Sequence, residues 1–293
     1  MRTILKKRKV VNNILIVSFG GLGDILNATP IAKHYKLENS ENNVSFLTRE
    51  KYKFVVQNSK FIDNIYCMES PTLNNVKMSR GYKNMIEQEF KGYKIIFSAP
   101  YMSPKYDGSA RSTLLKIIKN ECVDIKNWNC EFIPNITLSD DEISEAQSFF
   151  NTLSGRKKIL LEYENFSEQS PYDKSFFYAL CDKINNKNYD LILTGLKEPE
   201  YLEFAKNKYN INFYHYNRSF MSNAELYNLC DMFVGCCSGI TCLTSSEYCV
   251  TDKTRIEICR GEHWSSVDWT HNDQNKYICY DFNSFSDVLS KVD

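Results

Sequence analysis

A carboxylic acid stands directly after a glycine-rich turn near the start of the chain. The turn holds Gly20, Gly21 and Gly23, and Asp24 follows the last of them. The apolar run Ile14–Val17 precedes the turn and a helical pattern follows it, which predicts a strand, a tight turn and a helix start. Backbone N–H groups and the positive end of the helix dipole meet there. A carboxylate at this place suits a base for a neutral hydroxyl group; the alternative is a plain turn in which Asp24 caps the helix.

This run resembles the N-terminal signature of the heptosyltransferase-like glycosyltransferases, glycosyltransferase family 9, which have the GT-B fold. Leu22–Asp24 and Ala28–Pro30 match the Leu-Gly-Asp turn and the Ala-Thr-Pro segment of that signature without gaps. Val44–Thr48 and Phe61–Tyr66 also resemble the second and third strands of the family's first domain. The resemblance implies that Asp24 is the catalytic base.

A second glycine turn lies in the C-terminal half, between a strand-like run and a helix start. It resembles the Asp-Ser/Thr-Gly-x-x-His loop of the family, but Cys237 stands at the Asp position and Cys242 at the His position. Amide groups in such a turn suit a diphosphate. The resemblance therefore implies four donor-binding residues, which are Ser238, Gly239, Ile240 and Thr241. The two cysteines imply either a different donor or a loss of activity.

Three further residues are donor-binding groups by resemblance. Ser170 precedes a predicted helix near the donor diphosphate, although Ser167–Ser170 lacks the cation that the family often has there. Glu198 follows a strand that approaches the nucleotide; it either hydrogen-bonds ribose hydroxyls or is a solvated acid. Met221, just before a helix, matches a residue near the nucleotide base.

The acceptor is expected on the N-terminal half, because Asp24 belongs to that half. Gly21 and Gly23 lie beside the base, and Lys105 and Arg111 lie in a long segment without predicted secondary structure. Acceptors of the family are anionic, and an arginine fork can bind a phosphate or a carboxylate with two hydrogen bonds. The alternative is two solvated bases on a loop.

The elements that must position these residues alternate between strands and helices, which indicates βαβ units and parallel sheets. We predict an α/β protein with two Rossmann-like doubly wound domains, 1–154 and 155–293, facing a cleft in which the carboxyl ends of the strands lie. Capping boxes are predicted at Ser139–Glu142 and within Met221–Glu225. The predicted strands are Ile14–Phe19, Val44–Thr48, Ile62–Met68, Tyr93–Ala99, Lys158–Tyr163, Leu191–Gly195, Ile211–Tyr216, Met232–Cys236, Ile256–Cys259 and Tyr277–Phe282.

The composition fits two ordinary globular domains in 293 residues. Lysine and arginine number 36, as do aspartate and glutamate, so the charge balance argues against a nucleic-acid binder. No apolar run is long enough to span a bilayer, and we expect a cytoplasmic protein. Five basic residues in the first ten form either a solvated leader or a peripheral contact with the anionic inner membrane, which would suit a lipid-linked acceptor.

The 11 cysteines do not form pairs at zinc-ligand spacing, and only four histidines are present. We therefore expect no metal and no cofactor, and mostly buried, reduced thiols. The group from Cys236 to Cys249 is dense enough to leave metal binding open as an alternative.

The sequence thus predicts an inverting, metal-independent glycosyltransferase that moves a sugar, such as a heptose, from a nucleotide-sugar donor to a surface glycan or lipid-linked acceptor. The first alternative is an inactive homologue that still binds a nucleotide or a sugar. The second is a dinucleotide-dependent oxidoreductase, but Leu26 stands where that fingerprint has its third glycine.

Overall fold

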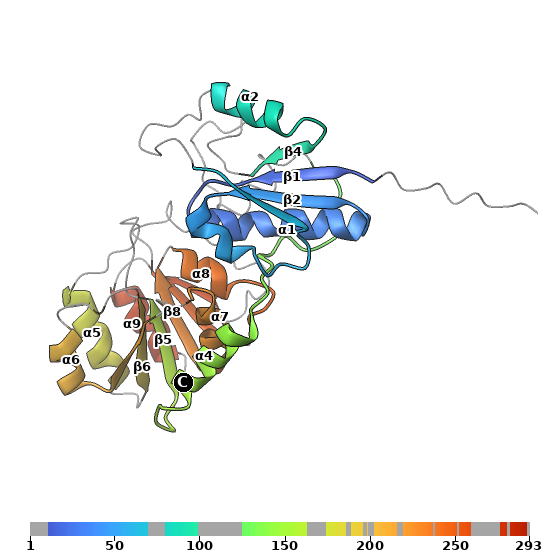
Figure 1. Cartoon of the computed structure of the whole chain (residues 1–293). Coiled ribbons are helices and arrows are strands. Elements are labelled where there is room, and N and C mark those ends of the chain that lie inside the picture. Colours follow the sequence, from blue (N-terminus) through green and yellow to red (C-terminus); the bar gives the residue numbers. More distant parts are fainter. Residues whose placement is uncertain are drawn as a thin grey trace, which may run out of the picture.

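The computed structural model contains two parallel β-sheets with helices on both faces of each (Figure 1). It describes residues 11–69, 80–98, 125–162, 174–185, 189–195, 198, 202–215, 219–236, 238–250, 252–258, 276–279 and 282–291.

The first sheet has the strand order β3-β2-β1-β4. Its strands are β1 (Asn13–Val17), β2 (Asn43–Thr48), β3 (Asn64–Cys67) and β4 (Lys94–Phe97). Side chains of β1 alternate between two cores, because successive residues of a strand point to opposite faces. Ile14 and Ile16 pack with helix α1 (Leu22–Glu38), and Leu15 and Val17 pack with helix α2 (Arg80–Glu89).

The second sheet has the order β10-β9-β8-β5-β6-β7, and all of its strands are parallel. They are β5 (Lys158–Glu162), β6 (Asp190–Gly195), β7 (Ile211–His215), β8 (Met232–Cys236), β9 (Thr254–Ile258) and β10 (Lys276–Cys279). Its helices are α5 (Lys174–Asn185), α6 (Leu202–Lys208), α7 (Ser222–Leu229), α8 (Gly239–Thr244) and α9 (Phe282–Lys291). The helices α5, α6 and α9 contribute to the core on one face of this sheet, and α7 and α8 to the core on the other.

Each sheet reverses its strand order at one place. In the first sheet the chain proceeds outward from β1 to β3 and then returns to the other side of β1 with β4. In the second it proceeds from β5 to β7 and returns beside β5 with β8. Ligands of open α/β sheets bind at the carboxyl ends of the strands at such a point. The turn after β1 and the turn after β8 therefore occupy the expected places for binding sites.

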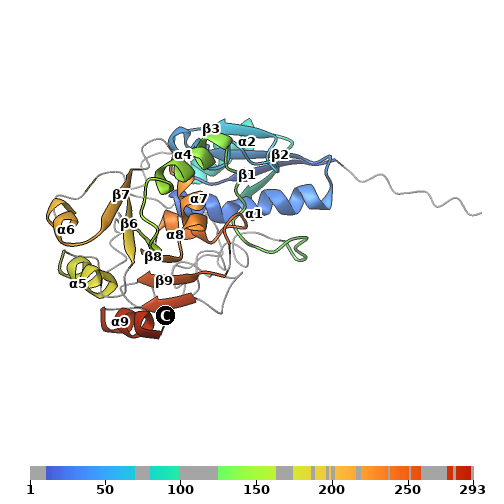
Figure 2. The same cartoon turned by 90° about the horizontal axis from the view of Figure 1, so that it is seen from below.

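The two halves pack directly on one another. Helix α1 lies beside α8 in both views (Figures 1 and 2), and buried apolar residues of both halves form one continuous core. Lys33 of α1 forms an ion pair with Glu247, which also accepts a 2.7 Å hydrogen bond from the Asn135 amide. Helix α4 (Asp140–Phe150) packs on α7 of the second half although it precedes residue 155. The boundary at residue 155 stays a prediction.

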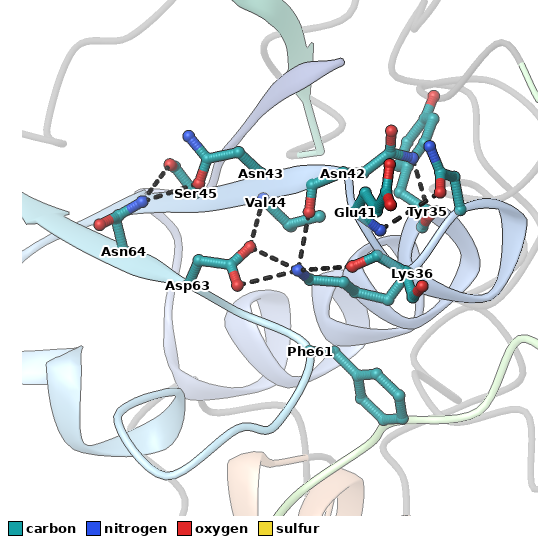
Figure 3. Close-up of polar contacts among 12 residues, drawn as sticks. Tyr35, Lys36, Glu41, Asn42, Asn43, Val44, Ser45, Phe61, Asp63 and Asn64 are labelled. Carbon is teal, nitrogen blue, oxygen red and sulfur yellow. Dashed lines mark hydrogen bonds and ion pairs between the residues drawn. The ribbon is translucent and has the colours of Figure 1, made fainter. Parts of the chain in front are cut away.

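Polar contacts fix the C-terminal end of α1, far from the glycine turn (Figure 3). The Nζ of Lys36 lies 2.7 Å from a carboxylate oxygen of Asp63 and donates a 2.7 Å hydrogen bond to the carbonyl of Asn42. The Asp63 carboxylate also accepts a 2.7 Å hydrogen bond from the backbone N–H of Val44. Because Asn42 and Asp63 directly precede β2 and β3, α1 is tied to the amino ends of these strands, and its N-terminus is held at the opposite end.

The ten predicted strands are all present, with bounds that differ by a few residues. The Ser139–Glu142 capping box is confirmed, because the Ser139 hydroxyl accepts from the Glu142 N–H and the Glu142 carboxylate accepts from the Ser139 N–H. The capping box within Met221–Glu225 is wrong. Ser222 lies inside α7 and donates to the carbonyl of Ser219, while the Glu225 carboxylate accepts from two side chains elsewhere in the fold.

Among the described residues, no helix has the length and apolarity that a membrane crossing requires.

Candidate functional site

The glycine turn after β1 folds tightly around the Asp24 side chain. Gly21 is the N-cap of α1, and its N–H donates a 2.7 Å hydrogen bond to Oδ2 of Asp24. A Cβ on Gly20 would lie 2.0 Å from the same oxygen, so only glycine fits there. The alternative role, in which Asp24 caps the helix, is therefore observed. This cap also fixes the carboxylate at the carboxyl end of β1.

Opposing effects act on the acidity of Asp24. Desolvation in the packed turn raises its pKa above the ordinary value, whereas the Gly21 N–H and the positive charge of Arg49 lower it. Asp24 nevertheless keeps some exposed surface. A carboxyl group with a raised pKa and partial access is suited to receive a proton.

The turn after β8 forms the predicted Ser-Gly helix start. Ser238 is the N-cap of α8, and its Oγ accepts hydrogen bonds from the N–H groups of Ile240 at 3.1 Å and Thr241 at 3.3 Å. Thr241 is completely buried and its hydroxyl donates to the carbonyl of Cys236. The turn is therefore fixed to the end of β8.

A buried acid, Glu162, supports this turn from below. It is the last residue of β5; one oxygen of its carboxyl group accepts a hydrogen bond from the hydroxyl of Ser238, and the other lies 3.3 Å from Oγ1 of Thr241. Burial raises the pKa of Glu162 to about 8, although the hydrogen bonds from Ser238, Thr241 and Cys236 act in the opposite direction. At neutral pH the proton therefore stays mostly on Glu162. Sequence reasoning missed this residue, although an acid ending an otherwise apolar strand was visible.

The two turns meet at close range. A Cβ on Gly23 would lie 3.1 Å from Sγ of Cys242, and a Cβ on Gly239 would lie 2.8 Å from Cβ of Leu22. Asn27, which is buried in α1, places its Nδ2 3.9 Å from the same sulfur. Small residues on both sides thus permit the approach of α1 to α8 that Figures 1 and 2 show. The base expected from the sequence and the expected donor loop are brought together.

The remaining predicted residues lie in varied surroundings. Glu198 is exposed and pairs with Lys206 at 2.5 Å, as the solvated-acid alternative requires. Met221 is buried in the core shared by the two halves. Four residues of the predictions lie outside the described residues: Lys105, Arg111, Ser170 and Cys237.

The cysteines that the structure describes are mostly buried. Burial raises the pKa of Cys181 and Cys230 to about 12 and that of Cys249 to about 11, so these thiols are poor nucleophiles. Within the described ranges, no cluster of histidine, cysteine, aspartate and glutamate side chains has the geometry of a metal site.

Comparisons with known proteins agree on the architecture. No protein-family model and no curated protein matches the sequence. A glycosyl transferase family 9 structure from Veillonella parvula superposes with a TM-score of 0.66 and 12% identity, over 97% of each chain. The E. coli heptosyltransferase WaaC with ADP superposes with a TM-score of 0.61 and 10% identity, over 95% of this chain and 98% of WaaC. The E. coli ADP-heptose LPS heptosyltransferase II superposes with a TM-score of 0.56 and 10% identity, over 95% of this chain and 99% of that protein.

The chain has the GT-B fold. The two parallel sheets, their helices and the nearly complete overlap with these glycosyltransferases confirm the fold class that the sequence predicted. At 10–12% identity the likeness concerns the fold, and function has to be argued from the site.

Proposed function

We propose that the protein is a glycosyltransferase that moves a sugar from a nucleotide-sugar donor to an acceptor hydroxyl. The observation that carries the proposal is the direct approach of the Asp24 turn to the Ser238 turn, through Gly23 and Cys242. A base and a phosphate-binding turn are the two parts that such a reaction needs. The two turns lie at points where the sheets reverse their order, in a fold shared with glycosyltransferases, which supports these roles.

The proposed reaction is a single displacement. Asp24 takes the proton of the acceptor hydroxyl as its oxygen attacks the anomeric carbon from the face opposite the leaving group. The new glycosidic bond forms, the bond from carbon to diphosphate oxygen breaks, and the electron pair leaves with the diphosphate. The configuration is inverted. General-base catalysis of this kind contributes roughly 10²- to 10⁴-fold.

The leaving diphosphate is proposed to lie against the turn from Ser238 to Thr241 without a divalent metal. Backbone amides aimed at developing negative charge stabilise such a group. Because Glu162 holds its proton at neutral pH, little negative charge lies beneath the turn to repel a phosphate. Glu198 is the proposed ribose ligand, with Met221 near the base and Ser170 near the diphosphate.

The donor and acceptor classes rest on the resemblance and on similar structures. One similar E. coli heptosyltransferase was solved with ADP-2-deoxy-2-fluoro heptose and another, TibC, with ADP-D-β-D-heptose. We therefore propose an ADP-sugar, such as an ADP-heptose, as the first donor to test. The acceptor is an anionic glycan or lipid-linked sugar held by Lys105 and Arg111, with the basic N-terminus at a membrane surface.

A second candidate is a binding protein without transferase activity. The observation that favours it is Cys242, which is buried against Gly23 and Asn27 at the position where the family loop has histidine. Such a protein would keep the nucleotide site and lack turnover.

A donor screen separates the two candidates. Purified protein is incubated with ADP-, GDP- and UDP-sugars and with lipo-oligosaccharide acceptors, and products are identified by mass spectrometry alongside thermal shifts. The proposal expects a mass increment of one sugar with one donor class. Thermal stabilisation by a nucleotide without any product supports the binding protein. If no product forms and no nucleotide stabilises the protein, both candidates are contradicted.

A further inference from the structure

Arg49 is a buried cation at the carboxyl end of the strands in the sheet that carries the proposed base. It directly follows β2, and its backbone is the N-cap of the 3-10 helix η1 (Glu50–Val55). Because β2 is the parallel neighbour of β1, Arg49 and the glycine turn lie at the same end of the sheet. Only 8% of the Arg49 surface is exposed.

The guanidinium is bound to the backbone that leads into the turn. One Nη2 N–H donates a hydrogen bond to the carbonyl of Phe19, the residue directly before Gly20. The guanidinium carbon also lies 5.7 Å from the ring centroid of Tyr52. Arg49 thus connects the end of β2 to the last residue of the β1 run, and it limits how far the glycine turn can move.

Among the described residues, the charge of Arg49 has no close counter-ion. In the part of the chain that the structure describes, no carboxylate lies within ion-pair distance of the guanidinium, and the buried Nε has no hydrogen-bond partner. Burying an unpaired charge is costly, on the scale of a core mutation. Arginine keeps its proton in proteins, so the group is a permanent positive charge. An apolar side chain would fill the same space at less cost, which indicates that the charge has a use.

We propose that Arg49 is a positioning residue for Asp24: its hydrogen bond to Phe19 fixes the glycine turn, and its permanent charge favours the ionised carboxylate. This inference rests on the proposed function only because that function makes Asp24 the base. A base must be ionised to accept a proton, and the packed turn disfavours ionisation. The positive charge of Arg49 acts against that effect.

Among the residues that the structure describes, the other groups packed around the turn are uncharged. Helix α8 brings the thiol of Cys242 and the carbonyl of Ser238 to Gly23. Helix α2 brings Tyr82, whose ring packs edge-on against Phe19 at 5.7 Å. Burial raises the pKa of Tyr82, so its hydroxyl is neutral at physiological pH. The turn itself contributes the neutral N–H of Gly21.

The test measures the ionisation of Asp24 with and without the Arg49 charge. The carboxyl carbon of Asp24 is followed by ¹³C NMR from pH 3 to pH 8, with its resonance identified by its loss in Asp24→Asn. The proteins compared are the wild type, Arg49→Gln, Arg49→Met and Arg49→Lys. Arg49→Met keeps the apolar stem in case Arg49→Gln does not fold. Lys53→Gln is the matched control, because it removes a positive charge from an exposed side chain of the same 3-10 helix.

We expect the Asp24 midpoint to rise in Arg49→Gln and Arg49→Met, because the positive charge of Arg49 lowers the pKa of Asp24, and to stay near the wild-type value in Arg49→Lys and Lys53→Gln. In an active enzyme the acid limb of kcat/KM moves by the same amount. An unchanged midpoint in both charge-removing variants overturns the inference, whatever their stability. Because the NMR titration needs no turnover, a protein without transferase activity still decides the role of Arg49.

Discussion

The carboxylate of Glu162 and the hydroxyl of Ser238 are joined by a hydrogen bond between the ends of β5 and β8. The same hydroxyl accepts the N–H groups of Ile240 and Thr241, so one oxygen links a buried acid to the first turn of α8. The protonation of Glu162 is thereby coupled to the turn in which we propose that the donor diphosphate binds.

The first prediction concerns stability and pH. The pKa of Glu162 is about 8 in the folded protein against an ordinary 4.5, so between these values the folded chain keeps a proton that the unfolded chain has released. The stabilisation from the Glu162 proton is full below pH 4.5 and is lost as the pH rises through 8. Over this range the free energy of unfolding falls by at most about 1.4 kcal/mol per pH unit. Urea unfolding of wild type and Glu162→Gln between pH 5 and pH 8.5 measures this slope.

Glutamine has the shape of the protonated acid and does not titrate. The difference in the free energy of unfolding between the two proteins should therefore shift in favour of Glu162→Gln as the pH rises. Glu203→Gln, on the exposed side of α6, should leave the wild-type slope unchanged. If the free energies of unfolding of wild type and Glu162→Gln change in parallel with pH, the pKa of Glu162 is not raised in the folded protein.

The second prediction concerns the contact between α1 and α8. Alanine has a helix propensity about 1 kcal/mol more favourable than that of glycine, which favours Gly23→Ala. The added Cβ, however, would lie only 3.1 Å from Sγ of Cys242. We expect Gly23→Ala to be neutral or destabilising alone and stabilising in a Cys242→Ala background. The double-mutant cycle should give a coupling energy of about 0.5 kcal/mol or more. Additive effects would show that the two helices do not approach as closely as described.

The third prediction concerns the start of α4, which packs against the second half. The Ser139 hydroxyl accepts the Glu142 N–H at 3.3 Å, so Ser139→Ala should cost about 1 kcal/mol of unfolding free energy. Ser139→Thr keeps the cap and should remain close to wild type. Equal urea midpoints for the alanine and threonine variants would remove the capping role.

Local sequence patterns predicted the strands and the two turns well, because short apolar runs and glycines act through neighbouring residues. Ser139–Glu142 was readable for the same reason. Met221–Glu225 shows the limit of such reading: the spacing of Ser222 and Glu225 fits a capping box, but tertiary partners from α4 and from Tyr248 take the carboxylate of Glu225.

The supporting groups of the site were not readable from local patterns. Glu162 meets Ser238 across 76 positions, and Arg49 meets Phe19 across 30. Both contacts exist because parallel strands bring distant carboxyl ends to one edge. An acid or a base at a strand end carries no signal of its own until the strand order is known.

The role of Asp24 is the central claim, and Asp24→Asn tests it most directly. Asparagine can still accept the Gly21 N–H that holds the turn, so the fold and donor binding should survive, which calorimetry with the nucleotide checks. Asp287→Asn, on an exposed position of α9, is the matched control and should behave as wild type. The account predicts that transfer to the acceptor, measured by mass spectrometry with the donor found in the screen, falls about 10²- to 10⁴-fold in Asp24→Asn. Near-wild-type transfer by this variant would contradict it.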